Sequence, residues 1–161
     1  MKNILKKLAL LAIPVAAWLA VFIAFEPNNY FGLKDSAGSS QPVARVRAYQ
    51  QDPGRNLILG DSRLAHFDME LVAEASGMEW QNLSFGGASL KETLDLADYV
   101  LDSGNPVDTL LVEVSFYTLN EHYNTDRFSQ LEETLENPLA YCLNLEYNVN
   151  ALTVLMDTIR G

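Results

Sequence analysis

Asn56-Leu57-Ile58-Leu59-Gly60-Asp61-Ser62-Arg63 joins an apolar run of strand character to a tight turn, and a segment of helical character begins at Leu64. A serine between a strand and a helix is held in a fixed position. The free N–H groups of the first helical turn can stabilise a negative charge that develops next to it. Ser62 is therefore the candidate nucleophile of the chain. The alternative is that its side chain only caps the helix.

Two further strand-like runs, 79–83 and 107–115, follow with helical segments between them. This alternation predicts an α/β fold with a parallel sheet, because parallel strands need right-handed crossover connections. The carboxyl ends of parallel strands meet at one edge of the sheet. We therefore expect Asp61-Ser62, Gly86-Gly87 and the stretch 116–122 to come together at that edge.

Capping residues predict where the helices begin and end. Asp68 is a suitable N-cap for a helix over 69–76, and Ser89 with Glu92 forms a capping box for a helix that reaches about Ser103. The buried face of that second helix is expected to consist of Leu90, Leu94, Ala97 and Leu101. Further helices are expected over 42–51, 127–136, 138–148 and 149–160.

The N-terminal segment is basic and then apolar: Lys2, Lys6 and Lys7 precede an uncharged run of 18 residues, Leu8–Phe25. This length favours an uncleaved membrane anchor with its N-terminus in the cytoplasm and the rest of the chain outside. A cleaved signal peptide and a buried soluble helix are the alternatives. The expected divisions are a transmembrane signal-anchor over 1–25, a linker with a short helix over 26–55, and an α/β domain over 56–161.

The charge of the chain excludes one class of partner. From Glu26 onward, eight basic residues stand against 21 acidic ones, which gives this part a formal charge of −13. Nucleic acid is therefore not an expected partner, because phosphate binding needs clustered Lys and Arg. Two distant histidines and one cysteine do not form a metal site. Glycine-rich nucleotide-binding motifs do not occur, so we expect no metal and no cofactor.

Four single residues carry further expectations. Cys142 has apolar neighbours and is expected to be buried rather than reactive. Arg45 is expected to be solvated, and Arg63 to form a surface ion pair rather than to bind an anionic substrate group. Glu113 interrupts an apolar strand pattern. It marks either a sheet edge or a buried carboxylate with a partner, and the pattern does not distinguish the two.

The motifs around the first two strands resemble a known family. Gly60-Asp61-Ser62 after a Leu/Ile strand is similar to the first sequence block of the SGNH, or GDSL-like, hydrolases. Asn82-Leu83-Ser84-Phe85-Gly86-Gly87 is similar to their second block. The resemblance covers roughly 56–120. It implies a three-layer, flavodoxin-like parallel sheet.

The resemblance also implies roles for individual residues. Ser62 would be the nucleophile, and the backbone N–H groups of Ser62 and Gly87 would form an oxyanion hole. Asp61 and Asn82 would support the site. With the N-terminal anchor, the chain looks most like the membrane-anchored, extracytoplasmic members that are related to D-alanine transfer and O-acetylation of cell-envelope polymers.

The chain departs from the family pattern in its third block, which usually reads Gly-x-Asn-Asp. Here Ser115 stands near the glycine position and Tyr117 near the asparagine. Asn120, three residues further on, is a candidate substitute as an oxyanion donor if the loop folds back.

The family's last block, Asp-x-x-His, does not occur in this sequence. His122 and His66 are the two candidate bases that remain, and a loop or surface role is the alternative for each. Only three strands are expected, where the family has about five. We therefore expect a truncated, incomplete domain, and the alternative is a complete chain that has lost catalysis.

The function expected from the resemblance is a membrane-anchored serine esterase or acyltransferase. Its expected partners are the membrane, an ester-bearing envelope polymer or a small ester, and a membrane protein. The alternative is a non-catalytic, SGNH-like binding or accessory subunit at the membrane. Because a base is missing, we expect little turnover from this chain in isolation.

Overall fold

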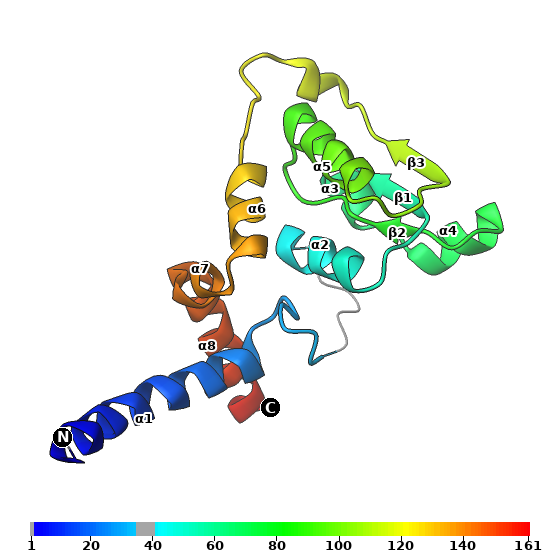
Figure 1. Ribbon diagram of the computed structural model, residues 1–161. Coiled ribbons are helices and arrows are strands. Elements are labelled where there is room, and N and C mark those ends of the chain that lie inside the picture. The colour runs from blue at the N-terminus through cyan, green and yellow to red at the C-terminus, as the bar shows by residue number, and fades with distance from the viewer. Residues whose placement is uncertain (1, 35–40) are drawn as a thin grey trace. The chain divides into compact units, whose positions relative to one another are not determined.

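The computed structural model describes residues 2–34 and 41–161, with the side chains of 7, 10–34 and 41–161 (Figure 1). The chain forms two compact units, of which one comprises 28–136 and the other comprises 1–27 together with 137–161. Part of the linker expected over 26–55, namely 35–40, lies outside the described residues. The two units are considered separately below.

A parallel sheet of three strands forms the centre of the unit 28–136. Its strands are β1 (Asn56–Leu59), β2 (Gln81–Asn82) and β3 (Thr109–Val112), in the order β2-β1-β3. Ile58 pairs with Asn82 on one side, and Leu59 pairs with Val112 on the other. The predicted α/β fold with a parallel sheet is therefore confirmed.

Both outer strands are shorter than the sequence predicted. Asn82 is the last residue of β2, and its side-chain oxygen accepts a hydrogen bond from the backbone N–H of Ser84 at 3.0 Å. Glu113 follows β3 and turns its carboxylate to the backbone N–H of Asp61, at 3.1 Å. Beyond these ends, the backbone N–H groups of Leu83, Phe85 and Glu113 still donate to carbonyl groups of β1 and the turn after it.

The core of this unit lies around β1. Leu57, Ile58 and Leu59 are almost fully buried, and each such side chain contributes about 1.5–3 kcal/mol through its removal from water. The buried apolar side chains from the neighbouring segments are Val46, Tyr49, Leu83, Phe85, Leu96 and Val100. Strand β1 therefore holds the turn that follows it rigidly.

The helices of this unit begin and end close to the predicted positions. They are α2 (Pro42–Gln51), α3 (Ser62–Ala65), α4 (Met69–Ser76), α5 (Leu90–Asp102), the 3-10 helix η1 (Phe116–Leu119) and α6 (Phe128–Glu136). Asp68 caps α4, and Ser89 and Glu92 form the complete capping box of α5. The local capping chemistry is therefore confirmed.

The prediction of the buried face of α5 was wrong in part. Leu94 and Leu101 are exposed, and the buried residues of this helix are Glu92, Thr93, Leu96, Ala97 and Val100. The physical reason is the buried carboxylate of Glu92, which is satisfied by partners outside the helix. Because Glu92 is buried, the side of the helix that carries Leu96 and Val100 faces the core. The side that carries Leu94 and Leu101 faces solvent.

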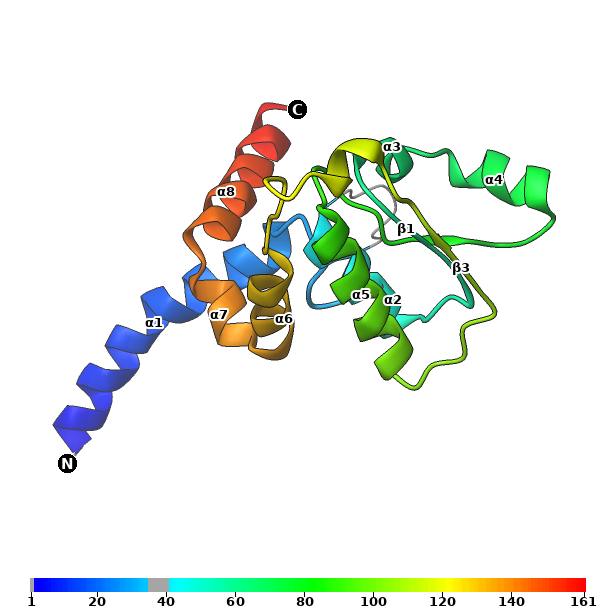
Figure 2. The ribbon, with the colours of Figure 1, turned by 90° about the horizontal axis from the view of Figure 1, so that it is seen from above.

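The second unit consists of helices from both ends of the chain: α1 (Lys2–Phe25), α7 (Pro138–Leu143) and α8 (Leu145–Arg160). α8 packs on α1, and Figure 1 shows it crossing the C-terminal half of that helix (Figure 2 gives the view from above). Trp18 on α1 donates a hydrogen bond from its indole nitrogen to Asn148 at 2.9 Å. The rings of Phe22 and Tyr141 are in edge contact with centroids 5.4 Å apart.

The boundary between the last two helices lies earlier than predicted. Asn144 ends α7 and caps α8, because its side-chain oxygen accepts hydrogen bonds from the N–H groups of Glu146 and Tyr147. The expected helices over 138–148 and 149–160 are corrected accordingly. Cys142 is buried, as predicted, and burial raises the pKa of its thiol, with the charge of Glu26 adding to the effect.

Within the described residues, no helix is both long enough and apolar enough to cross a membrane. The membrane anchor over 1–25 stays a prediction from the sequence.

Candidate functional site

Ser62 is the first residue of α3, directly after the turn that follows β1. Its side chain is exposed, and its hydroxyl forms no hydrogen bond with the residues that the structure describes. Its backbone N–H belongs to the first helical turn, where intrahelical acceptors are missing. Ser62 therefore presents a free hydroxyl next to a free N–H group at the carboxyl edge of the sheet.

Asp61, its neighbour, is fixed by several hydrogen bonds. One carboxylate oxygen accepts from the backbone N–H of Arg63 at 2.9 Å, and the other accepts from Ser115 at 3.0 Å and from the hydroxyl of Tyr117. Burial acts to raise the pKa of Asp61. The hydrogen bonds from Arg63, Tyr117 and Ser115 outweigh it and lower this pKa to about 2. Asp61 thus bonds the backbone of the turn, and its supporting role in a catalytic site stays a prediction.

The carboxylate of Glu113 has hydrogen-bonding partners. The sequence pattern did not decide between this arrangement and a sheet edge. It accepts hydrogen bonds from the Asp61 backbone N–H at 3.1 Å and from Ser115 at 2.8 Å. The guanidinium of Arg63 bridges both carboxylates, at 2.7 Å from Asp61 and 2.9 Å from Glu113. Arg63 therefore forms the expected ion pair, and the end of β3 is tied to the turn after β1.

Tyr117 stands near the position where the family pattern has an asparagine. Its hydroxyl donates to Asp61, and this bond, followed by burial, raises the pKa of Tyr117. The ring of Tyr117 also stacks below the guanidinium of Arg63, at 5.0 Å. The side chain that replaces the asparagine is therefore engaged with the turn and offers no amide donor.

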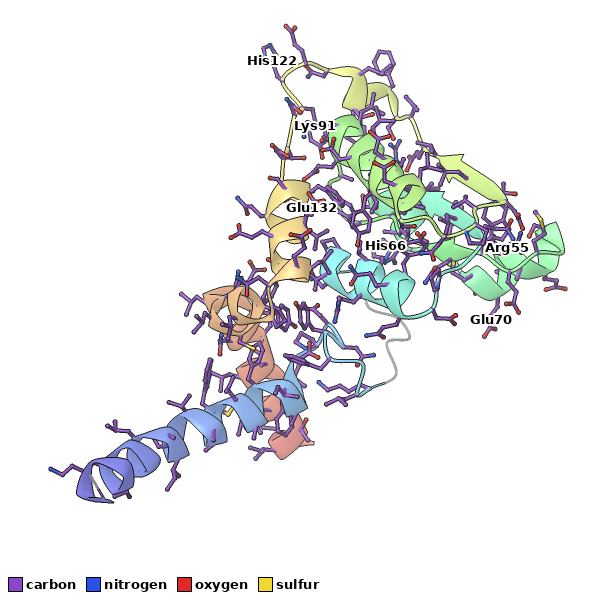
Figure 3. All side chains as sticks on the ribbon, in the orientation of Figure 1. Arg55, His66, Glu70, Lys91, His122 and Glu132 are labelled. Atoms are coloured by element: carbon purple, nitrogen blue, oxygen red, sulfur yellow. The ribbon has the colours of Figure 1, made fainter. Side chains whose placement is uncertain are left out.

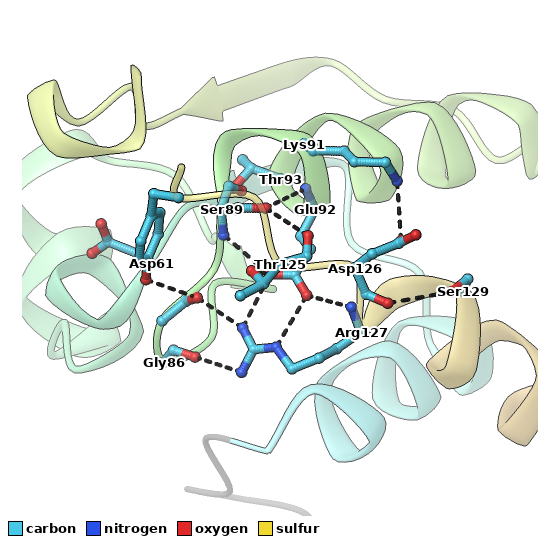
Figure 4. Close-up of polar contacts among 12 residues, drawn as sticks. Asp61, Gly86, Ser89, Lys91, Glu92, Thr93, Thr125, Asp126, Arg127 and Ser129 are labelled. Atoms are coloured by element: carbon cyan, nitrogen blue, oxygen red, sulfur yellow. Dashed lines mark hydrogen bonds and ion pairs between the residues drawn. The ribbon is translucent and has the colours of Figure 1, made fainter. Parts of the chain in front are cut away.

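The loop after β2 is held through its carbonyl groups. Arg127 donates to the carbonyl oxygens of Gly86 at 3.3 Å and Gly87 at 2.8 Å, and Tyr123 donates to Gly87 at 3.1 Å (Figure 4). Gly87 has a φ of 66°, which favours glycine. The backbone N–H of Gly87 forms no hydrogen bond with the described residues. It is therefore available as an oxyanion donor.

Glu92 anchors Arg127 from within the core. Its buried carboxylate pairs with the Arg127 guanidinium at 3.0 Å and accepts from Thr125 and from the backbone N–H of Ser89. Burial acts to raise the pKa of Glu92, but the hydrogen bonds from Arg127, Thr125 and Ser89 lower it to about 2. Sequence reasoning assigned Glu92 to the capping box only. It did not predict that Arg127 pairs with Glu92. The one available signal was that Arg127 is a basic residue in an acidic segment.

Asn82 and Arg45 connect the site to the body of the unit. The side-chain amide of Asn82 donates to the carbonyl of Leu64 at 2.7 Å. Arg45 on α2 donates to the carbonyls of Ala65 at 2.6 Å and Asn82 at 3.2 Å. The expectation of a solvated Arg45 was therefore wrong: it is half-buried between α3 and β2, and burial lowers its pKa.

The histidines and Asn120 lie on exposed segments (Figure 3). His66 is the C-cap of α3, and no hydrogen bond joins it to Ser62 within the described residues. His122 lies 3.8 Å from the adjacent Glu121, and both are almost fully exposed. The side chain of Asn120 accepts a hydrogen bond from the His122 backbone N–H at 3.0 Å. The structure therefore shows no hydrogen-bonded contact of these three residues with Ser62.

The carboxyl edge of the sheet carries groups that acyl chemistry would need. A free hydroxyl lies at the end of β1, and a free N–H group lies in the loop after the neighbouring strand β2. No group of three His, Cys, Asp or Glu side chains in the described part of the chain could hold a metal ion. No family model, curated protein or solved structure matches the chain.

Proposed function

We propose that this protein is a membrane-anchored serine esterase or acyltransferase of the SGNH type, acting outside the cytoplasm on ester-linked acyl groups of a cell-envelope glycan. A small ester is the simplest substrate of the same chemistry. The observation that carries the proposal is the exposed, unbonded hydroxyl of Ser62 at the carboxyl end of the central strand. The sheet would be part of a three-layer, flavodoxin-like domain.

The proposed reaction begins when the Ser62 hydroxyl attacks the acyl carbon of the ester and loses its proton to a base. The negative charge that forms on the carbonyl oxygen is stabilised by the N–H groups of Ser62 and Gly87. Each donor of this kind is worth about 3–4 kcal/mol. The alcohol then leaves with a proton, and a water molecule or a sugar hydroxyl takes the acyl group from Ser62.

The base that this reaction needs is not identified among the described residues. His66 and His122 are exposed, and in the part of the chain that the structure describes neither forms a hydrogen bond with Ser62. We therefore propose that the base comes from outside the 161 residues, from a further segment or a partner. Residues 1–161 alone should show little turnover. Robust ester hydrolysis by them would mean that one of the two histidines serves as the base.

A second candidate function is a non-catalytic binding or accessory subunit at the membrane. The observation that favours it is the engagement of Tyr117 with Asp61 in place of an asparagine donor. In that case the polar network around Asp61 would serve to hold the loops in shape, and Ser62 would only begin α3.

A fluorophosphonate probe, which reacts with activated serine hydroxyls, distinguishes the two functions. The protein as its gene encodes it should be labelled, and Ser62→Ala should not be. Ser129→Ala is the matched control, because Ser129 is an exposed serine on α6 outside the site, and it should be labelled like the parent protein. Equal labelling of the parent and of Ser62→Ala would exclude Ser62 as the nucleophile.

A further inference from the structure

Helix α8 carries an exposed apolar stripe that the fold leaves uncovered. Its side chains are 46–79% exposed and recur at intervals of four, three, four and three residues: Leu145, Val149, Leu152, Met156 and Ile159. At about 3.6 residues per turn, this spacing places all five on one side of the helix. The stripe runs along the whole length of α8.

One flank of the stripe is polar. It includes Glu146, Thr153, Asp157 and Arg160, all of which are exposed. A helix with an exposed apolar stripe beside a polar flank is typical of a helix at a membrane interface. Among these polar side chains, Glu146 and Asp157 are acidic and Arg160 is the one basic residue. Burial of apolar surface, rather than attraction to anionic lipids, would therefore drive its binding.

The stripe lies next to another exposed apolar surface in the same compact unit. α8 packs on α1 through Ala151 and Asn148, which line a small apolar pocket with Trp18 and Phe22. Further along, α1 exposes Leu10, Leu11, Ile13 and Val15. The segment Leu8–Phe25 contains no charge. The short helix α7 adds two more exposed leucines, Leu139 and Leu143.

We propose that this apolar surface, formed by α1 and the stripe of α8, contacts the hydrocarbon of a lipid bilayer, with α8 lying in the interface. This inference rests on the membrane location in the proposed function. A second copy of the chain is the alternative occupant, and it would shield the stripe from water without lipid contact. The uncharged segment of α1 in the same unit favours lipid.

Lipid contact can be measured by fluorescence quenching in phosphatidylcholine vesicles that contain spin-labelled lipids. An environment-sensitive probe is attached to single cysteines in the full protein, on a Cys142→Ala background. Val149→Cys and Met156→Cys report on the stripe, and Thr153→Cys and Asp157→Cys are matched controls on the polar side. Val15→Cys reports on α1.

The stripe positions should be quenched at least twofold more than the polar positions, and adding phosphatidylserine should not increase the effect. Quenching at Val15 without quenching at Val149 and Met156 would overturn the inference while leaving the membrane location intact. Absence of quenching at Val15 as well would overturn both. Probes on the stripe that are shielded from water but unquenched by lipid would indicate a protein partner and would also overturn it.

Discussion

Ser62 and Asp61 are adjacent in the chain and have opposite environments. The hydroxyl of Ser62 is exposed and unbonded, whereas the carboxylate of Asp61 is buried and receives hydrogen bonds from three residues. The structural role of Asp61 and the ion pair of Arg63 could be predicted, because both depend on neighbours in the turn. The contact with Tyr117 could not, because the two residues meet only through the pairing of β1 with β3.

The ion pair of the buried Glu92 with the half-exposed Arg127 makes stability depend on pH. Because the pKa of Glu92 is about 2 in the folded chain and near 4.3 when unfolded, its contribution is fully present above about pH 4.3. It is lost as the pH falls toward 2. Glu92→Gln should therefore flatten the loss of stability between these pH values, as measured by urea unfolding followed by circular dichroism.

The control for this experiment is Glu132→Gln, which changes an exposed carboxylate on α6. It should keep the pH dependence of the parent protein. Asp61, whose pKa is also about 2, accounts for the part of the slope that remains in Glu92→Gln. An unchanged slope in Glu92→Gln would contradict the assignment of the depressed pKa to this residue.

Among the elements, helices could be predicted better than strands. The N-caps Asp68 and Ser89 decide helix starts from local chemistry. β2 ends at Asn82 and β3 ends just before Glu113, and both side chains form hydrogen bonds at the edge of the sheet that local sequence signals do not show. The buried face of α5 likewise depends on Arg127, which is distant in sequence, and was for that reason wrongly predicted from periodicity.

The close packing of the turn between β1 and α3 can be tested by a substitution of Gly60. A methyl group there would lie 2.7 Å from the Cβ of Glu113 and 2.6 Å from its carboxylate, so β3 would have to shift. Gly60→Ala should lower the free energy of unfolding by about 1–3 kcal/mol. Urea denaturation measures this change.

Gly86→Ala is the matched control, since a methyl group on Gly86 meets nothing within 4 Å. It should change the free energy of unfolding by less than about 0.5 kcal/mol. If both variants were equally stable, β1 and β3 would not be packed as closely at their carboxyl ends as the structure shows.

At the scale of the whole molecule, the two ends of the chain belong to one compact unit. Local sequence signals placed 137–161 with the domain that starts at Asn56, whereas the structure groups this segment with α1. Contacts such as Tyr141 with Glu26, at 2.6 Å, join residues more than a hundred positions apart. Periodicity and capping carry no information about such pairs, so this grouping needed the folded chain.

The candidate site likewise has features that could be predicted from the sequence and features that could not. The sequence predicted the convergence of the loops that carry Ser62 and Gly87, and the parallel order of the strands supports it. It did not predict how the second loop is held, because Arg127 and Tyr123 reach it from the segment after β3. The proposed chemistry therefore depends on a loop whose shape is set by residues outside the recognised motifs.

The most direct test of the account is to locate the phosphonate adduct in the protein as its gene encodes it. Cleavage after Arg55 and Arg63 releases the peptide Asn56–Arg63, in which Ser62 is the single serine. We predict that mass spectrometry of the labelled protein finds the added mass on this peptide, at Ser62. An adduct on any other peptide, or no adduct at all, would contradict the claim that Ser62 is the reactive hydroxyl.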